Sequence, residues 1–278
     1  MLFLGRIGEI GNEDAIKQQN DSDATLVAIA GVSIYAQSGL AQQATGAPAA
    51  PEGKAALPLD PRVQQRAYDF AFPGTSRVAH VNLPYSVFVS SRVAKDKKSP
   101  LIIALHGLGE DPDTRMRGNL LDLAEAGGYI VFAPAATTRV AGMEFPGLLL
   151  RWHGSRSRSC RDKRNLTQLS EKNVMDLLAM ARKEFNVDGH RTYLMGHSME
   201  GAGTLYLGSR YASNWAAVAA VAPAAQRMES DMESILAKLT MPVLMIQGDA
   251  DTAVPVENTR NWLAAIGTTR LTVGTTIA

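Results

Sequence analysis

The chain has 278 residues, of which 46% are hydrophobic and 20% are charged. Its length and composition are typical of one large globular domain with a sizeable core. The formal net charge of +1 offers no electrostatic basis for binding nucleic acid or an anionic membrane surface. The single cysteine, Cys160, cannot form an internal disulfide, and no cysteine–histidine spacing resembles a zinc site, so no metal is expected.

The N-terminal part contains an apolar run at residues 24–36. It is shorter than the roughly 20 residues that a membrane-spanning helix needs, so no membrane span is predicted. Its length suits the central part of a signal peptide, and residues 39–41 offer small side chains for cleavage. However, Asp21 and Asp23 lie where positive charge is expected. We interpret residues 24–41 as a poorly formed signal-like segment, which suggests a secreted or periplasmic protein; a plain N-terminal extension is the alternative.

A linker composition follows, because residues 42–61 are rich in alanine, proline, glutamine and glycine. We therefore expect an N-terminal extension over residues 1–60 and a folded domain over residues 61–278. Within the domain, short apolar runs alternate with amphipathic segments, and a capping residue, Thr167 or Ser170, is expected at the start of one helix. The expected elements are strand 67–72, strand 85–90, strand 101–105, helix 120–126, strand 129–133, helix 170–185, strand 191–195, helix 202–210, strand 216–222, strand 243–247, helix 255–266 and strand 270–273.

This alternation predicts an α/β fold with βαβ units, in which a mostly parallel central sheet carries helices on both faces. Functional groups in such a fold lie beyond the carboxyl ends of the strands. Three segments of this sequence fall there, and each follows a predicted buried strand.

The first of these segments is Gly196-His197-Ser198-Met199-Glu200-Gly201, between a predicted strand and a predicted helix. A serine on such a sharp turn holds its hydroxyl above the sheet, and the next amide, that of Met199, faces the same space. We predict that Ser198 is a nucleophile; a turn that only connects strand and helix is the alternative. The usual pattern is G-x-S-x-G, so Glu200 is a departure. We expect it to strain the backbone by about 1–3 kcal/mol and to place a carboxylate near the nucleophile.

The other two segments supply the partners of such a nucleophile. The turn His106-Gly107-Leu108-Gly109 follows strand 101–105, and the Leu108 amide is the expected second donor of an oxyanion hole. A plain glycine turn is the alternative. After strand 243–247, Asp251 is the expected acid that orients an imidazole. Asp249 is the alternative acid, with a local turn-capping role expected for it instead.

Residues 60–278 resemble the bacterial esterases of the α/β-hydrolase superfamily, particularly the feruloyl-esterase, polyhydroxyalkanoate-depolymerase and phospholipase/carboxylesterase-like group. The resemblance implies a Ser-Asp-His triad, ester substrates and no cofactor. The stretches that carry it are PLIIALHGLG (100–109), AEAGGYIVFAP (124–134), NLTQLSEKNVMDLL (165–178), TYLMGHSMEGAGT (192–204), residues 220–223 and residues 247–256.

The triad histidine is not visible where these enzymes place it, which is after the last strand. No histidine follows Asp251, and we expect the chain to be truncated or frame-shifted within residues 268–278. Two other histidines are candidate substitutes: His153, in a long loop after strand 129–133, and His106, beside the predicted oxyanion hole. A missing base is the favoured interpretation, since geometry has to decide for either substitute.

These observations together predict a serine-nucleophile carboxylic-ester hydrolase that acts on small or short-acyl esters through an acyl-enzyme. A catalytically impaired hydrolase-fold protein that binds esters or a partner is one alternative, and a serine peptidase is the other, because the same triad cleaves amides. A small-molecule ester is the expected partner, with no nucleic acid, no membrane span and no cofactor.

Overall fold

The computed structural model describes residues 59–73, 78–107, 110–117, 119–135, 163–266 and 272–277. The signal-like segment, residues 42–58 of the linker, Leu108, His153 and Cys160 lie outside the described residues. Within the described part, no helix combines the length and apolarity that crossing a membrane requires. The truncation expected within residues 268–278 stays a prediction.

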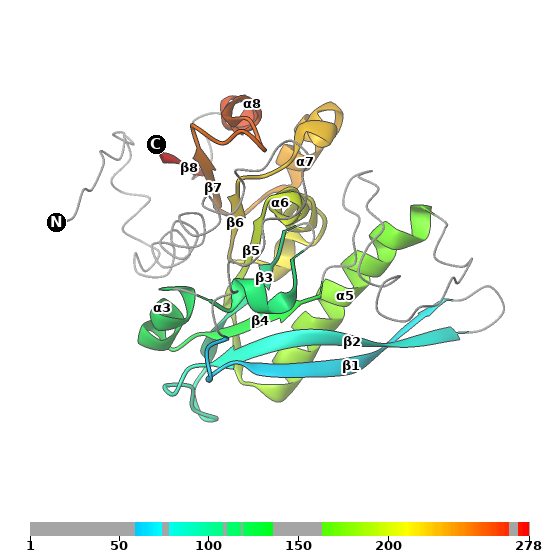
Figure 1. The fold of residues 1–278 in the computed structure, drawn as a ribbon, viewed down its shortest axis with the longest axis vertical. Helices are drawn as coiled ribbons and strands as arrows, with labels where there is room; N and C mark the ends of the chain where they lie inside the picture. The colour runs from blue at the N-terminus through cyan, green and yellow to red at the C-terminus, as the bar shows by residue number, and fades with distance from the viewer. Residues whose placement is uncertain are drawn as a thin grey trace, which may run out of the picture.

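An eight-stranded sheet forms the centre of the described domain, with strand order β1-β2-β4-β3-β5-β6-β7-β8 (Figure 1). β1 and β2 pair antiparallel, β2 pairs antiparallel with β4, and all remaining neighbours are parallel. The strands are β1 (Gln64–Pro73), β2 (Val78–Val89), β3 (Ser99–Leu105), β4 (Ile130–Pro134), β5 (Val187–His197), β6 (Ala217–Val221), β7 (Val243–Gly248) and β8 (Thr272–Ile277).

Helices cover both faces of this sheet, as the alternating pattern predicts. α3 lies on one side of the sheet, and α5 and α6 lie on the other (Figure 1). Because β3, β4, β6 and β7 are buried along their whole length, their apolar side chains fill both layers of the core. The helices are α3 (Asn119–Gly127), α5 (Lys163–Glu184), α6 (Met199–Arg210), α7 (Met232–Lys238) and α8 (Val256–Ile266), with short 3-10 turns that include η1 (Pro112–Arg115).

One sequence-based expectation about the helices is wrong, and one helix was not predicted. The helix expected over residues 170–185 begins at Lys163, so Thr167 and Ser170 lie inside α5 and do not cap it. The apolar positions that predicted this helix, from Val174 onward, mark the part that packs on the main core, whereas Leu169 nearer its start packs against β1 and β2. α7 was not predicted, because this seven-residue helix buries only one side chain, that of Ile235.

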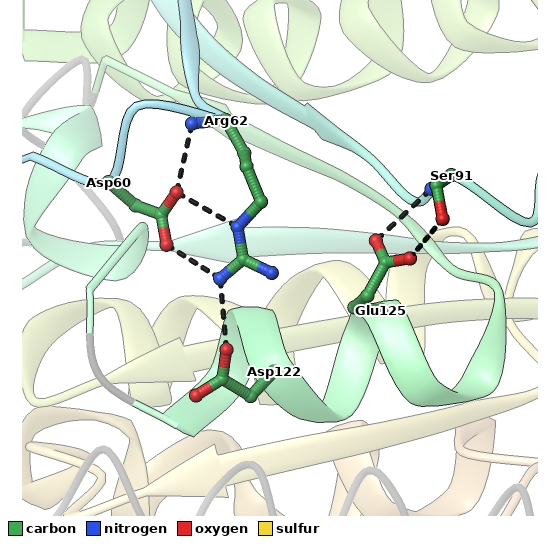
Figure 2. A network of polar contacts seen from close by, with 5 residues as sticks. All are labelled: Asp60, Arg62, Ser91, Asp122 and Glu125. Atoms are coloured by element: carbon green, nitrogen blue, oxygen red, sulfur yellow. Dashed lines mark hydrogen bonds and ion pairs between the residues drawn. The ribbon is translucent and has the colours of Figure 1, made fainter.

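Polar contacts attach α3 to the segment before β1 and to the turn after β2 (Figure 2). The Arg62 guanidinium donates to Asp60 at 2.6 Å and to Asp122 at 2.9 Å. The Glu125 carboxylate accepts the Ser91 amide at 3.1 Å. Exposed contacts of this kind add little net stability, so the buried faces hold the fold together. The Ser91 turn lies at the amino edge of the parallel strands, since Ser90 bonds to the residue before β4.

Candidate active site

Ser198 lies between the end of β5 and the start of α6, with φ 57° and ψ −119°. Such a backbone costs about 1–3 kcal/mol in a residue with a side chain, and it persists only where its surroundings enforce it. The enforcement is visible in the hydrogen bonds. The Ser198 amide donates to the Val221 carbonyl at 2.9 Å, and the Ser198 carbonyl accepts the amides of Gly201 at 2.9 Å and Ala224 at 3.0 Å. The end of β6 therefore fixes the turn that carries Ser198.

Two glycines permit the close packing of strand and helix at this turn. A Cβ on Gly196 would come within 2.2 Å of the Glu200 carbonyl oxygen and 2.6 Å of the Thr204 hydroxyl. A Cβ on Gly201 would come within 2.8 Å of the Val221 carbonyl oxygen. All three distances are too short for a contact between heavy atoms, so both positions require glycine. Gly201 thus allows α6 to lie close to β6. It stands one position after the place of the second glycine in the usual G-x-S-x-G pattern.

Glu200 differs from the sequence-based expectation in two respects. It lies in the first turn of α6, and the non-glycine residues with positive φ among those described are Ser198 and Ala222, so the backbone strain expected at Glu200 is found at Ser198. Glu200 is 5% exposed, and burial raises its pKa to about 8. Burial therefore favours the neutral acid at pH 7 over the carboxylate expected near the nucleophile.

Asp251 lies in the loop after β7, half-buried, whereas Asp249 is exposed. One oxygen of the Asp251 carboxylate accepts the amides of Ala253 at 2.9 Å and Val254 at 3.0 Å. The other oxygen accepts the side-chain amide of Gln247 at 3.0 Å. These bonds hold the carboxylate in one orientation at the carboxyl edge of the sheet.

Gln247 is a residue that sequence reasoning missed. It is 1% exposed at the end of β7, donates to Asp251 and to the Val254 carbonyl at 2.8 Å, and accepts the Thr259 hydroxyl at 3.0 Å. The sequence does hold one sign of its role, because Gln247 is a polar residue directly after the apolar residues 243–246 of a predicted buried strand. Its three contacts make Gln247 the support for the Asp251 loop.

The strand order brings the three predicted segments to one edge. β5 lies between β3 and β6, and β7 follows β6, with all four strands parallel. The turn after β3, the Ser198 turn and the Asp251 loop therefore share the carboxyl edge, where α/β sheets place their sites. The structure places Met199 at the first position of α6, directly after Ser198. The second expected oxyanion amide, that of Leu108, lies outside the described residues and stays a prediction.

Two buried histidines lie beside this edge. His106 is 3% exposed, and its Nδ1 lies 2.9 Å from the Gly107 carbonyl oxygen; burial lowers its pKa. His197 is also 3% exposed, and its Nδ1 has no hydrogen-bond partner among the described residues. Burial and then the nearby Arg115 lower the pKa of His197 to about 4. The substitute roles of His106 and of His153, the latter outside the described residues, stay predictions.

The parallel sheet with a strained serine between β5 and α6 defines an α/β-hydrolase. The model of the phospholipase/carboxylesterase family matches residues 88–269, which is more than half of the chain. The chain belongs to this family. The predicted fold class and the resemblance to esterases are thereby confirmed.

Several individual proteins are also similar to this chain, at low sequence identity. A bifunctional acetylxylan esterase/xylanase from Neocallimastix patriciarum is 28% identical over 148 residues, which are 52% of this chain and 18% of that protein. A thermostable esterase matches with TM-score 0.51 and 24% identity, covering 76% of this chain and 54% of that one. A ferulic acid esterase from Anaeromyces mucronatus matches with TM-score 0.55 and 14% identity, covering 77% and 84%. At these identities the two structures show the fold alone, and the chain spans only part of the first two proteins.

Proposed function

We propose that the chain hydrolyses carboxylic esters with Ser198 as the nucleophile, through an acyl-enzyme. The observation that carries this proposal is the backbone of Ser198, with φ 57° and ψ −119° at the junction of β5 and α6. Strained backbone of this kind is concentrated at functional sites. A serine in this position has its hydroxyl exposed above the sheet, where a substrate can reach it.

The proposed reaction has two stages. The Ser198 oxygen attacks the acyl carbon while a base takes its proton, and the amides of Met199 and Leu108 hold the negative oxygen that forms. The alcohol then leaves with a proton, and the acyl group stays on Ser198. Water attacks this acyl-enzyme in the second stage, which releases the carboxylic acid and restores the serine. Asp251 would orient the imidazole that transfers the protons, for which His106 and His153 are the candidates.

Small or short-acyl esters are the proposed substrates. The acetylxylan esterase named above supports this choice, because acetyl is a short acyl group. A catalytically weak hydrolase-fold protein is the second candidate. It is favoured by Glu200, which takes the place of the second glycine of the usual G-x-S-x-G pattern two residues after Ser198.

Turnover of p-nitrophenyl acetate, butyrate and octanoate tests the proposal. We expect Ser198→Ala to reduce hydrolysis to the background rate, while Ser234→Ala, a change of an exposed serine in α7, leaves it unchanged. Equal rates for the wild type and Ser198→Ala would refute the catalytic proposal. Labelling of Ser198 by a fluorophosphonate without measurable ester turnover would support the weak hydrolase instead.

The acid has a matched pair of variants. We expect Asp251→Asn to lower kcat by about 10³–10⁴-fold, as loss of a correctly oriented imidazole does in serine hydrolases. Asp249→Asn alters an exposed residue two positions away and should have little effect. A larger effect of Asp249→Asn would reverse the assignment of the acid.

A further inference from the structure

A charge pair between a buried arginine and a half-buried glutamate lies beside the turn after β3. Glu110 follows this turn, and one oxygen of its carboxylate accepts both the Gly107 amide and the Arg115 guanidinium, each at 2.7 Å. The other oxygen lies 3.8 Å from Nδ1 of His197, the residue before Ser198. One carboxylate therefore contacts the turn after β3, the 3-10 helix η1 and the end of β5. Neither Glu110 nor Arg115 belongs to the triad or the oxyanion hole proposed above.

Arg115 is held in an energetically unfavourable way. Its side chain is 3% exposed, and two of its guanidinium nitrogens, Nε and Nη1, have no hydrogen-bond partner among the described residues. Burial lowers the pKa of Arg115, and Glu110 counteracts this effect. A buried ion pair of this kind is weak evidence for a role in stability, because apolar side chains of similar volume often serve as well. The pair is better explained by what it positions.

The positioned element is the turn that carries the predicted oxyanion amide. Glu110 accepts the Gly107 amide, so that amide is not available to a substrate. The next amide along the chain, that of Leu108, is the donor predicted from the sequence. A Cβ on Gly107 would lie 3.1 Å from Nδ1 of His197, which shows how closely the turn packs against the strand that ends at Ser198. The two predicted oxyanion amides, of Leu108 and Met199, belong to the two segments that Glu110 brings together.

We propose that Glu110 is a positioning residue for the oxyanion hole, which fixes the turn after β3 at a set distance from the Ser198 turn, with Arg115 as its buried counter-charge. This inference rests on the proposed function. Oxyanion stabilisation depends on donors held at hydrogen-bond distance from the developing charge, and removal of one donor lowers kcat by about 10²–10³-fold. A displacement of the turn by about 1 Å can lower the rate by as much as 10²-fold.

Kinetics of Glu110→Met test the inference. Methionine has a similar length but no oxygen to accept the Gly107 amide and no charge to balance Arg115. We expect kcat for p-nitrophenyl butyrate to fall by about 10–100-fold while KM changes by less than about 2-fold, because the turn acts on the transition state. Glu125→Met is the matched control, since Glu125 also accepts a turn amide, that of Ser91 (Figure 2). That turn lies at the opposite edge of the sheet, so the control should leave kcat unchanged.

Instability of Glu110→Met is met by a second variant. Glu110→Met combined with Arg115→Met removes both charges and should fold, as measured by thermal unfolding, yet retain the low kcat, because the Gly107 amide still lacks its acceptor. A folded double variant with the wild-type kcat would overturn the inference, as would a wild-type kcat in Glu110→Met. Both of these outcomes leave the proposed function intact if Ser198→Ala is inactive. A wild type no faster than Ser198→Ala would instead overturn the proposed function itself.

Discussion

The buried carboxyl of Glu200 makes the stability of this protein depend on pH in an unusual direction. Burial raises its pKa from the usual 4.5 to about 8. Between these values the unfolded chain is ionised at this position and the folded chain is protonated. The stabilisation is therefore fully present below about pH 4.5 and is lost as the pH rises to about 8. Multiplying the difference in pKa by 1.36 kcal/mol per pKa unit gives a loss of about 4–5 kcal/mol.

Glu200→Gln tests this reasoning, because glutamine has the same shape but does not ionise. Urea unfolding at pH 5, 7 and 9 measures the free energy of unfolding of the wild type and the variant. We expect the wild type to lose up to about 4–5 kcal/mol relative to Glu200→Gln between pH 5 and pH 9. Glu233→Gln, which changes an exposed glutamate in α7, should follow the wild type at every pH. Parallel curves for the wild type and Glu200→Gln would show that Glu200 is ionised in the folded protein.

Two further predictions concern the packing around the site. Gly201→Ala should lower the free energy of unfolding by about 1–3 kcal/mol in urea, because its Cβ would lie 2.8 Å from the Val221 carbonyl oxygen. Gly189→Ala is its control, since no atom lies within 4 Å of the Cβ there, and equal losses in the two variants would contradict the packing argument. Gln247→Leu should lower kcat for p-nitrophenyl butyrate by about tenfold through the lost hydrogen bond to Asp251. An unchanged kcat would show that the hydrogen bond from Gln247 supports the Asp251 loop without contributing to catalysis.

The Ser198 turn and the Glu110 pair share a physical logic. Both contain an arrangement that is unfavourable in isolation: a left-handed serine in one case and an incompletely bonded buried arginine in the other. The Ser198 turn is held by the end of β6, a segment distant in the sequence, and the arginine is held by Glu110, five residues before it. Strain that surrounding structure enforces is a property of sites that are preorganised for reaction.

The alternation of strands and helices, and the position of Ser198 between a strand and a helix, could be predicted from the sequence. These features follow from local patterns: short apolar runs mark strands that are buried on both faces, and glycines mark a turn too tight for side chains. The family match over residues 88–269 agrees with that prediction of the fold. Local patterns did not find α7, which buries too little apolar surface to show periodicity.

The contacts between charged and polar groups could be found only in the folded chain. Glu110, Arg115 and His197 come from separate segments, and nothing in their spacing predicted that one carboxylate would contact the other two. The support of Asp251 by Gln247 likewise required the loop to fold back on β7. Glu200 was visible as a departure from the pattern, but its protonation was not, because a pKa depends on burial, and burial is a property of the folded chain as a whole.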